Sequence, residues 1–273
     1  MEDILTNPST AELITAVEAN LSGWLPVFGR MGRVYLKNPP GVKRSMTNVS
    51  ISLFNSIMDA RLSPEKVDEA IETIKADAKM HKVPVLWWLG PSSQPVDLAN
   101  HLINQGFMVD DDGPGMTVDL ASVNTNLPAP PGLSITLAQD ESARQEWIEL
   151  MAKGFEVPLP HDRMINGWLN LFRHADPQTT FTYTGWLNDR PVATSLLFLA
   201  AGVAGIYAVC TIPEARRAGM GAWITLHALL QARDREYRVG VLEASAIGAR
   251  MYRSLGFKDV CTISSYVWRP ETS

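Results

Sequence analysis

The sequence predicts an α/β (α+β) fold: two tandem mixed sheets with helices on both faces. Strand-like and helix-like apolar runs alternate along residues 133–268, which is typical of a mixed sheet covered by helices. A proline-rich segment interrupts the pattern near the middle of the chain. Hydrophobic residues make up 46% of the 273 residues, so a sizeable core is expected rather than global disorder.

The segment 121–132 reads ASVNTNLPAPPG and is the clearest linker, because three prolines break any apolar period. It leaves halves of about 120 and about 140 residues, each a normal domain size. We therefore expect one domain at 1–120, a linker at 121–132 and a second domain at 133–273.

The second half begins with a predicted strand, after which Asp140 can cap a helix. Asn188 and Asp189 suit a turn between strands, and Gly256 suits a helix end. The elements expected in order are a strand at 133–138, helices at 144–153 and 162–174, strands at 181–187, 192–199 and 206–212, a helix at 221–237, a strand at 239–244, a helix at 247–254 and a strand at 257–268.

Residues 192–210 carry no charge, and this length approaches the ~20 residues that span a bilayer. Thr194, Ser195, Gly202 and Gly205 interrupt the run, and the flanking charge asymmetry of a membrane span is missing. A buried β-hairpin is therefore expected instead of a membrane helix.

The first half repeats part of this order. Ser63 is expected to cap a helix with Pro64 at its first position. Gly106 and the phenylalanine after it correspond to Gly256 and its phenylalanine, which indicates a structural repeat. The expected elements are a strand at 57–61, a helix from 64 to about 78, a strand at 83–89 and a helix at 95–104.

The bulk properties exclude several classes of function. The net charge is −5 and no basic stripe occurs, which argues against nucleic-acid and anionic-membrane partners. The two cysteines, Cys210 and Cys261, are interpreted as reduced core thiols. Residues 1–5 lack the features of a signal peptide, so a cytoplasmic location is expected. The five histidines have no metal-ligand spacing, and no metal is expected.

The most informative segment is 209–222, where an apolar strand leads through a glycine-containing loop into a helix. Free N–H groups and the helix dipole at such a point favour a phosphate or pyrophosphate. The dinucleotide fingerprint fails because Ile224 stands at its third glycine, and no P-loop occurs. The run from Arg216 to Gly221 matches [RQ]-x-x-G-x-[GA] in full.

Two motifs together resemble the GNAT superfamily of N-acetyltransferases. Thr211-Ile212-Pro213 occupies the lead-in to the first motif. About 25 residues after it, Tyr252, Gly256 and Phe257 match a second signature, in which Ser245 replaces the usual Asn and Gly248 the usual Ala. The resemblance covers residues 133–269 well and residues 1–120 only as a divergent copy, as in tandem GNAT proteins with one inactive half.

This resemblance implies an acetyl-CoA site in the second half. Backbone groups of Val209, Cys210 and Thr211 would bind the pantetheine arm, and Ser245 could reach it. Tyr252 would lie near the cofactor sulfur as the general acid, with a packing residue as the alternative. The loop residues expected at the pyrophosphate are Arg216, Arg217, Ala218, Gly219, Met220, Gly221 and Ala222. In the first half the corresponding stretch has no glycine pair, and Glu65 would repel phosphate.

The expected activity is transfer of an acetyl group from acetyl-CoA to a primary amine by direct attack. The acceptor would be a small molecule or a peptide amine. The alternatives are a non-catalytic acyl-CoA-binding module and a structural module that keeps only the fold. Glu156, His161 and Tyr207 are conceivable general bases, and none is singled out. The acceptor, the acyl chain length and the oligomeric state stay open, with a homodimer as one possibility.

Overall fold

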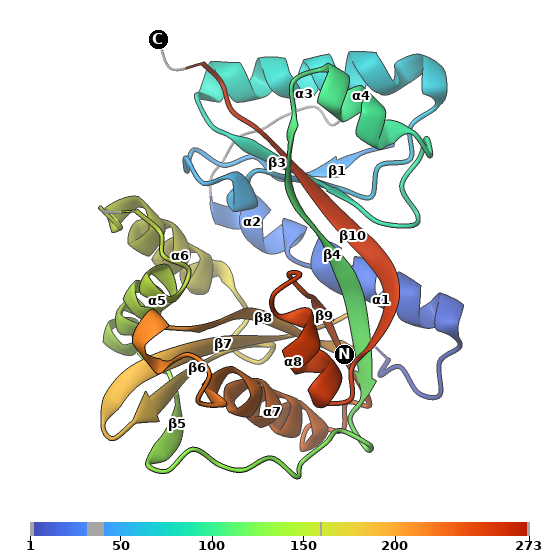
Figure 1. Ribbon diagram of the computed structural model, residues 1–273. Coiled ribbons are helices and arrows are strands. Elements are labelled where there is room, and N and C mark those ends of the chain that lie inside the picture. Colours follow the sequence, from blue (N-terminus) through green and yellow to red (C-terminus); the bar gives the residue numbers. More distant parts are fainter. Residues whose placement is uncertain (1–2, 32–40, 159, 272–273) are drawn as a thin grey trace. The chain divides into compact units, whose positions relative to one another are not determined.

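The computed structural model describes residues 3–31, 41–158 and 160–271 (Figure 1). The expectation that no signal peptide is present rested on residues 1–5, and Met1 and Glu2 of that segment lie outside the described ranges. The chain divides into two compact units: Met1–Leu21 with Gly115–Val260, and Ser22–Pro114 with Cys261–Ser273. Both units draw on separate stretches of chain, so they do not follow the boundaries expected at residues 121–132.

The first unit holds a sheet in the order β4-β9-β8-β7-β6-β5. The β8–β9 pair is parallel and the other pairs are antiparallel, so the sheet is mixed, as predicted. Its strands are the end of β4 (Met108–Asp119), β5 (Leu133–Leu137), β6 (Thr180–Leu187), β7 (Arg190–Ala200), β8 (Val203–Thr211), β9 (Val239–Glu243) and the start of β10 (Lys258–Trp268). Its helices are α1 (Thr10–Ser22, which belongs to this unit as far as Leu21), α5 (Glu141–Gly154), α6 (Asp162–His174), α7 (Met220–Arg233) and α8 (Ala249–Ser254).

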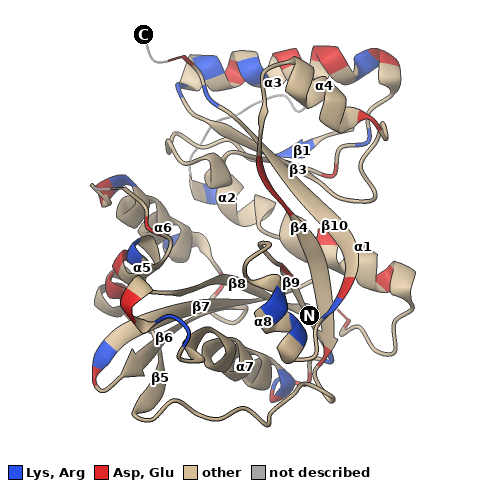
Figure 2. Ribbon diagram, viewed as in Figure 1, with Lys and Arg blue, Asp and Glu red and all other residues tan. Residues whose placement is uncertain are grey.

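The uncharged run forms the hairpin of β7 and β8, as predicted. Its turn places Ala201 and Gly202 at φ 54° and 71°. Figure 2 shows the ribbon of these strands almost entirely in tan; Arg190 at the start of β7 is their one Lys, Arg, Asp or Glu. Within the described ranges, no helix is long and apolar enough to cross a membrane.

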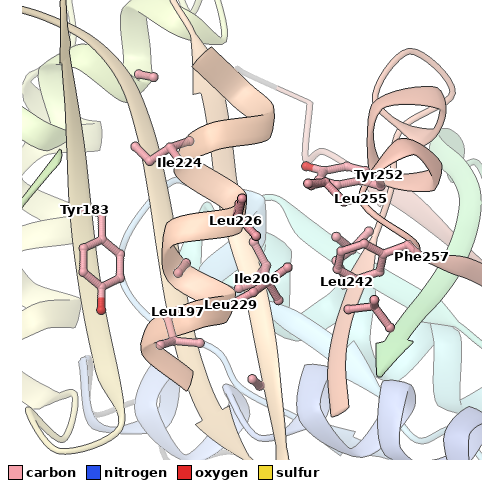
Figure 3. Close-up of a cluster of buried hydrophobic side chains, with 14 of the residues drawn as sticks. Tyr183, Leu197, Ile206, Ile224, Leu226, Leu229, Leu242, Tyr252, Leu255 and Phe257 are labelled. Carbon is pink, nitrogen blue, oxygen red and sulfur yellow. The ribbon is translucent and has the colours of Figure 1, made fainter. Parts of the chain in front are cut away.

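Helices α5 and α7 pack on opposite faces of this sheet. A Cβ at Gly185 would lie 3.3 Å from Ile224 of α7, whereas a Cβ at Gly154 of α5 would overlap Cys210 of β8. Leucine and isoleucine side chains from β7, β8 and α7 fill the space beneath α7 (Figure 3). Asp140 caps α5 as predicted, accepting from the Ala143 N–H at 2.8 Å.

Helix α1 was not predicted, and one buried side chain fixes it to the sheet. Asn20 donates from Nδ2 to the Ala200 carbonyl at 2.9 Å, and its Oδ1 accepts from the Tyr207 hydroxyl at 2.7 Å. A Cβ at Gly205 would overlap Asn20 Oδ1, so the missing side chain at Gly205 makes room for this contact.

The second unit holds a smaller mixed sheet in the order β1-β2-β3-β10, with β2 and β3 parallel. One face of α3 is fully buried, as predicted, through Val67, Ile71, Ile74 and Ala78. The elements are α2 (Leu25–Met31), β1 (Lys43–Arg44), the 3₁₀ turn η1 (Ser52–Phe54), β2 (Ser56–Met58), the 3₁₀ turn η2 (Pro64–Lys66), α3 (Val67–His81), β3 (Val85–Leu89), α4 (Leu98–Asn104), the start of β4 and the end of β10.

Several expected boundaries are wrong by a few residues. Ser63 makes no side-chain cap, because the 3₁₀ turn η2 separates it from α3. The strand expected at 57–61 ends at Met58, and Arg61 makes only an isolated bridge to Gln94. The helix expected at 221–237 ends at Arg233, followed by a polar turn in which Glu236 has φ 70°.

The predicted repeat is visible where α4 and α8 end. Gly106 and Gly256 have φ 86° and 102°, a conformation that favours glycine. The N–H of the phenylalanine after Gly106 donates to the Leu102 carbonyl at 3.0 Å, and the one after Gly256 donates to Tyr252 at 3.2 Å. Leu102 in the second unit thus stands where the first unit has Tyr252.

The two strands that follow these helix ends are each divided between the units. In β4, the stretch from Gly115 to Asp119 pairs with β9 of the first unit. In β10, the stretch from Ser264 to Trp268 pairs with β3 of the second unit. The final strand of each half therefore contributes residues to the other half's sheet.

Candidate active site

Strands β8 and β9 diverge toward one end of the first unit's sheet. Their paired residues are Ala204 with Gly240 and Gly205 with Val241, and the pairing stops there. Ala208 has φ 49°, and the register of β8 against β7 shifts beside it, which marks a β-bulge. The backbone of β8 beyond the bulge is therefore without a strand partner on its β9 side.

The loop that follows β8 ends at a helix N-terminus. Arg217 has φ 65° and Gly219 has φ 81°, so the chain reverses before α7 begins at Met220. The Trp223 N–H donates to the Gly219 carbonyl at 3.1 Å. The N–H groups of the three residues before Trp223 have no carbonyl one turn back, and together with the helix dipole they favour an anion.

The first arginine of the motif fastens this loop. Arg216 donates from Nε to the Thr211 carbonyl at 3.1 Å and from Nη2 to the Gly154 carbonyl at 2.8 Å. Its Nη1 lies 3.5 Å from Glu156 Oε1. Arg217 is exposed, and no described side chain pairs with its guanidinium. Arg217 is thus the available cation at the loop, whereas Arg216 is structural.

A cavity of about 740 Å³ connects the divergent strand, the loop and α8. It brings together the predicted site residues with one exception, because Ala218 is not among those that line it. The predicted residues that line it are Val209, Cys210, Thr211, Arg216, Arg217, Gly219, Met220, Gly221, Ala222, Ser245 and Tyr252.

Sequence reasoning missed several apolar residues of this cavity. Phe155 follows α5 and is 53% exposed, and Ile247 precedes α8 and is 95% exposed. Met251 lies on α8, and a Cβ at Gly221 would come within 3.0 Å of its Sδ. Large exposed apolar side chains beside a cavity indicate a ligand with an apolar arm. Phe155 lies outside both motifs, and Ile247 and Met251 stand at unspecified positions of the second signature, so only the fold could have identified them.

Tyr252 is 8% exposed, and its hydroxyl has no hydrogen-bond partner among the described residues. Its ring packs edge-on against Phe257 with centroids 5.8 Å apart (Figure 3). Burial, and then the nearby Cys210 thiol, raise the pKa of Tyr252 above its ordinary value. The phenol therefore stays protonated at neutral pH and is available as a proton donor.

Cys210 and Ser245 also line the cavity. Burial raises the pKa of Cys210 to about 11, so it is a thiol and not a nucleophile at neutral pH. Ser245 Oγ accepts from the Gly248 N–H at 3.2 Å, which leaves its own proton free to donate into the cavity. Cys261 is half-buried, so only Cys210 is a core thiol as expected.

The three conceivable bases are placed differently. Glu156 lines the cavity but is engaged by Arg216. His161 lies with Nε2 2.9 Å from the Val157 carbonyl and is not among the cavity residues. The Tyr207 hydroxyl donates to Asn20 Oδ1, as described above. None of the three is therefore singled out by the structure.

Among its described residues, the second unit shows no equivalent site. Before α3, the turn η2 replaces a glycine loop, and Glu65 is exposed there. A hydrogen bond from its own backbone N–H, and then one from Ser63, lower the pKa of Glu65, so it carries a negative charge where a phosphate would lie. Leu102, fully buried, takes the place of Tyr252.

Comparisons with known proteins agree with this geometry. Residues 124–242 match the sequence model of the family described as "Acetyltransferase (GNAT) domain". No curated protein matches the chain significantly.

Several solved structures have a fold similar to that of this chain. A GCN5-related N-acetyltransferase from Kribbella flavida is similar at a TM-score of 0.70 and 18% identity, over 93% of this chain and 96% of that one. One from Sphaerobacter thermophilus is similar at 0.58 and 18% identity, over 80% and 74%. A tandem GNAT protein from the clavulanic acid biosynthesis pathway is similar at 0.53 and 11% identity, over 93% and 96%. At sequence identities of 18% and below, these similarities show only that the fold is shared.

Proposed function

We propose that this chain, a GNAT-fold protein with an acetyltransferase (GNAT) domain match at residues 124–242, transfers an acetyl group from acetyl-CoA to a primary amine. The observation that carries the proposal is a single cavity that contains both a helix N-terminus suited to pyrophosphate and the free hydroxyl of Tyr252. The acceptor is a small-molecule or peptide amine.

The cavity suits acetyl-CoA in each of its parts. The first N–H groups of α7 and the cation of Arg217 suit the pyrophosphate. The unpartnered edge of β8 after Ala208 can hydrogen-bond the amides of the pantetheine arm, as an added strand would. Phe155 and Ile247 offer apolar cover at the cavity.

The reaction follows from these positions. The neutral amine attacks the thioester carbonyl, and holding both substrates in one cavity supplies much of the rate enhancement. A backbone N–H of β8 after the bulge, between Val209 and Thr211, stabilises the oxyanion. The C–S bond then breaks, and Tyr252 gives its proton to the departing thiolate. The attacking nitrogen loses one proton to solvent as the amide forms, and the tyrosinate regains a proton from solvent.

The alternative function, a non-catalytic or structural module, suits the second unit. That unit has neither a glycine loop nor a tyrosine at the position of Leu102. We assign it the role of a divergent GNAT-like copy that lacks the cofactor site, and place binding and chemistry in the first unit.

The test uses Ala222→Glu with Ala222→Gln as the matched control. Ala222 lines the cavity in the first turn of α7, where a carboxylate favours the helix but repels pyrophosphate. Acetyl-CoA at about 100 times its dissociation constant should stabilise the wild type by ~2.7 kcal/mol in a thermal shift. The Gln variant should retain more of this shift than the Glu variant. Equal shifts in both variants would place the ligand elsewhere.

Activity is tested by thiol release from acetyl-CoA with benzylamine, cadaverine, ethanolamine and a tripeptide with a free amino terminus. Release that depends on one of these amines supports acyl transfer. A thermal shift without release for any amine favours the non-catalytic binding module, and no shift at all removes the acetyl-CoA proposal.

A further inference from the structure

A second cavity, of about 810 Å³, belongs wholly to the second unit, where the chain after β10 reaches the C-terminal end of α3 (Figure 1). Its size is within the range of small-molecule sites, roughly 300–1,000 Å³. The cationic side chains that line it are Lys75, Lys79, Lys82 and Arg269, and Glu271 is the one carboxylate among its described lining residues. The lining therefore has an excess of three positive charges in a chain whose net charge is −5.

Most of these cations have no counter-ion. Lys75 pairs with Glu72 at 2.8 Å, and its side chain is only 13% exposed. In the part of the chain that the structure describes, Lys79, Lys82 and Arg269 form no ion pair. Three unpaired cations around one hollow concentrate positive potential there and attract a multiply charged anion.

The indole of Trp268 brings two of the lysines together. Lys75 Nζ lies 5.9 Å and Lys79 Nζ 5.8 Å from the ring centroid. The two lysines are one helical turn apart, a spacing at which like charges repel. The negative face of the ring offsets part of this repulsion, so both ammonium groups stay at the same wall of the cavity.

Trp268 also offers a hydrogen-bond donor. Its Nε1–H has no hydrogen-bond partner among the described residues. A Cβ at Gly106 would lie 3.9 Å from this nitrogen, so the glycine leaves room beside it. Both residues line the cavity. A neutral N–H donor among cations suits an anionic oxygen.

Stabilisation of the helix end explains only part of this arrangement. Lys79 is in the last turn of α3 and Lys82 is its C-cap, where cations interact favourably with the helix dipole. Lys75 lies a turn further back, and Arg269 follows β10. The helix dipole does not account for these two, so the convergence of all four cations on one cavity indicates a ligand.

The distribution of charge favours a compact ligand over a nucleic acid. A nucleic-acid site is typically a basic stripe along a helix or over one face. Figure 2 shows both signs of charge along α3, and Asp68 and Glu69 lie in its first turn. The positive excess is thus confined to the cavity at the other end of the helix.

We propose that this cavity binds a small ligand that carries a diphosphate group. Two phosphate groups carry a charge of about −3 to −4, which suits the excess of three positive charges. The guanidinium of Arg269 can bind one phosphate with two parallel hydrogen bonds, and the lysine ammonium groups can bind the other. The Nε1–H of Trp268 is a further donor to a phosphate oxygen. This site is separate from the acetyl-CoA cavity and does not depend on the proposed acetyltransferase function.

The experiment titrates the full chain with inorganic pyrophosphate by calorimetry. Ala222→Glu serves as the parent, because its added carboxylate repels pyrophosphate from the loop before α7. Pyrophosphate should bind this parent at least about ten times more tightly than orthophosphate at matched ionic strength, and added salt should weaken the binding. No binding at low salt, or binding no tighter than that of orthophosphate, would overturn the proposal.

Lys79→Gln in the same parent locates the ligand, with Lys66→Gln as the matched control. Lys66 is exposed at the N-cap of α3 and lies about 20 Å along the helix from Lys79, beyond the screening length of ~8 Å at physiological salt. Lys79→Gln should weaken pyrophosphate binding about tenfold, and Lys66→Gln less than about twofold. Both lysines are exposed, so both variants should fold, which melting without ligand verifies. Equal affinities in the two variants would place the ligand elsewhere and refute the assignment.

A hexaglutamate peptide tests the other class of partner. If it binds the parent more tightly than pyrophosphate and loses affinity in Lys79→Gln, the cavity takes an acidic protein segment and the diphosphate proposal is wrong. Weaker binding of the peptide than of pyrophosphate supports the proposal. None of these titrations contains acetyl-CoA, so their outcome is independent of the thermal shift that tests the proposed function.

Discussion

The guanidinium of Arg216 joins the motif loop to the end of α5, with Nη2 2.8 Å from the Gly154 carbonyl. Gly154 has no side chain at the place where Cys210 approaches it, so the helix end, the strand end and the loop meet at one point. The arginine that opens the motif therefore joins the loop to the ends of α5 and β8 at the wall of the cavity.

The two arginines of the motif should behave differently when replaced. Arg216→Ala removes two bonds to carbonyls and should weaken acetyl-CoA binding about tenfold, or ~1.4 kcal/mol, with little dependence on salt. Arg217→Ala removes an exposed cation and should weaken binding mainly at low salt. Calorimetric titration at two ionic strengths distinguishes them. The same salt dependence for both would contradict the structural role of Arg216.

Replacing Tyr252 with Phe should separate chemistry from binding. The hydroxyl has no partner among the described residues, so the thermal stability should stay the same or rise slightly. Because the proton donor is lost, kcat should fall roughly 100-fold while the KM for acetyl-CoA stays constant. Steady-state thiol release measures both. An unchanged kcat would leave Tyr252 as a packing residue.

The contact between α1 and the sheet should be costly to remove. Asn20→Ala removes the buried bonds to the Tyr207 hydroxyl and the Ala200 carbonyl, and should lower the free energy of unfolding by about 1–3 kcal/mol. Ala11→Gln on the exposed side of the same helix is the control and should change it by less than about 0.5 kcal/mol. Urea denaturation gives both values; equal effects would mean that Asn20 does not anchor α1.

The divided strands predict how fragments behave. The stretch from Gly115 to Asp119 pairs with β9 and supplies Met116 and Val118 to the core. A fragment of residues 133–273 lacks this stretch and should be insoluble or bind no acetyl-CoA. A fragment of residues 115–273 contains it and should be more soluble and bind acetyl-CoA better. Size-exclusion chromatography and the thermal shift compare the two. A folded, binding fragment 133–273 would support the boundary expected from the linker.

The sequence was most informative where the site is local in the chain. The loop, the start of α7 and Tyr252 belong to two short motifs, so their positions could be predicted and the cavity brings them together. Phe155 belongs to neither motif, and Ile247 stands at an unspecified position of the second signature, so their place at the cavity follows only from the fold.

Long-range pairing explains the remaining differences. Asn20 finds its carbonyl partners about 180 residues away, so the local pattern of α1 carried no sign of it. The partners of β4 and β10 are set by register and core contacts, which no linker composition encodes. For this reason the proline-rich segment at 121–132 looked like a boundary, although it lies within the first unit's stretch Gly115–Val260.

The division of β10 also constrains how the protein forms during synthesis. The second unit takes Tyr266 and Trp268 into its core, although the rest of that core comes from residues before Pro114. The first unit, in turn, combines residues up to Leu21 with Gly115–Val260. Domain-by-domain folding on the ribosome, in which each unit is completed before the next is synthesised, is therefore closed to this chain. The core of the second unit stays incomplete until Trp268 has been translated, and a stop before Tyr266 leaves that unit without the end of β10.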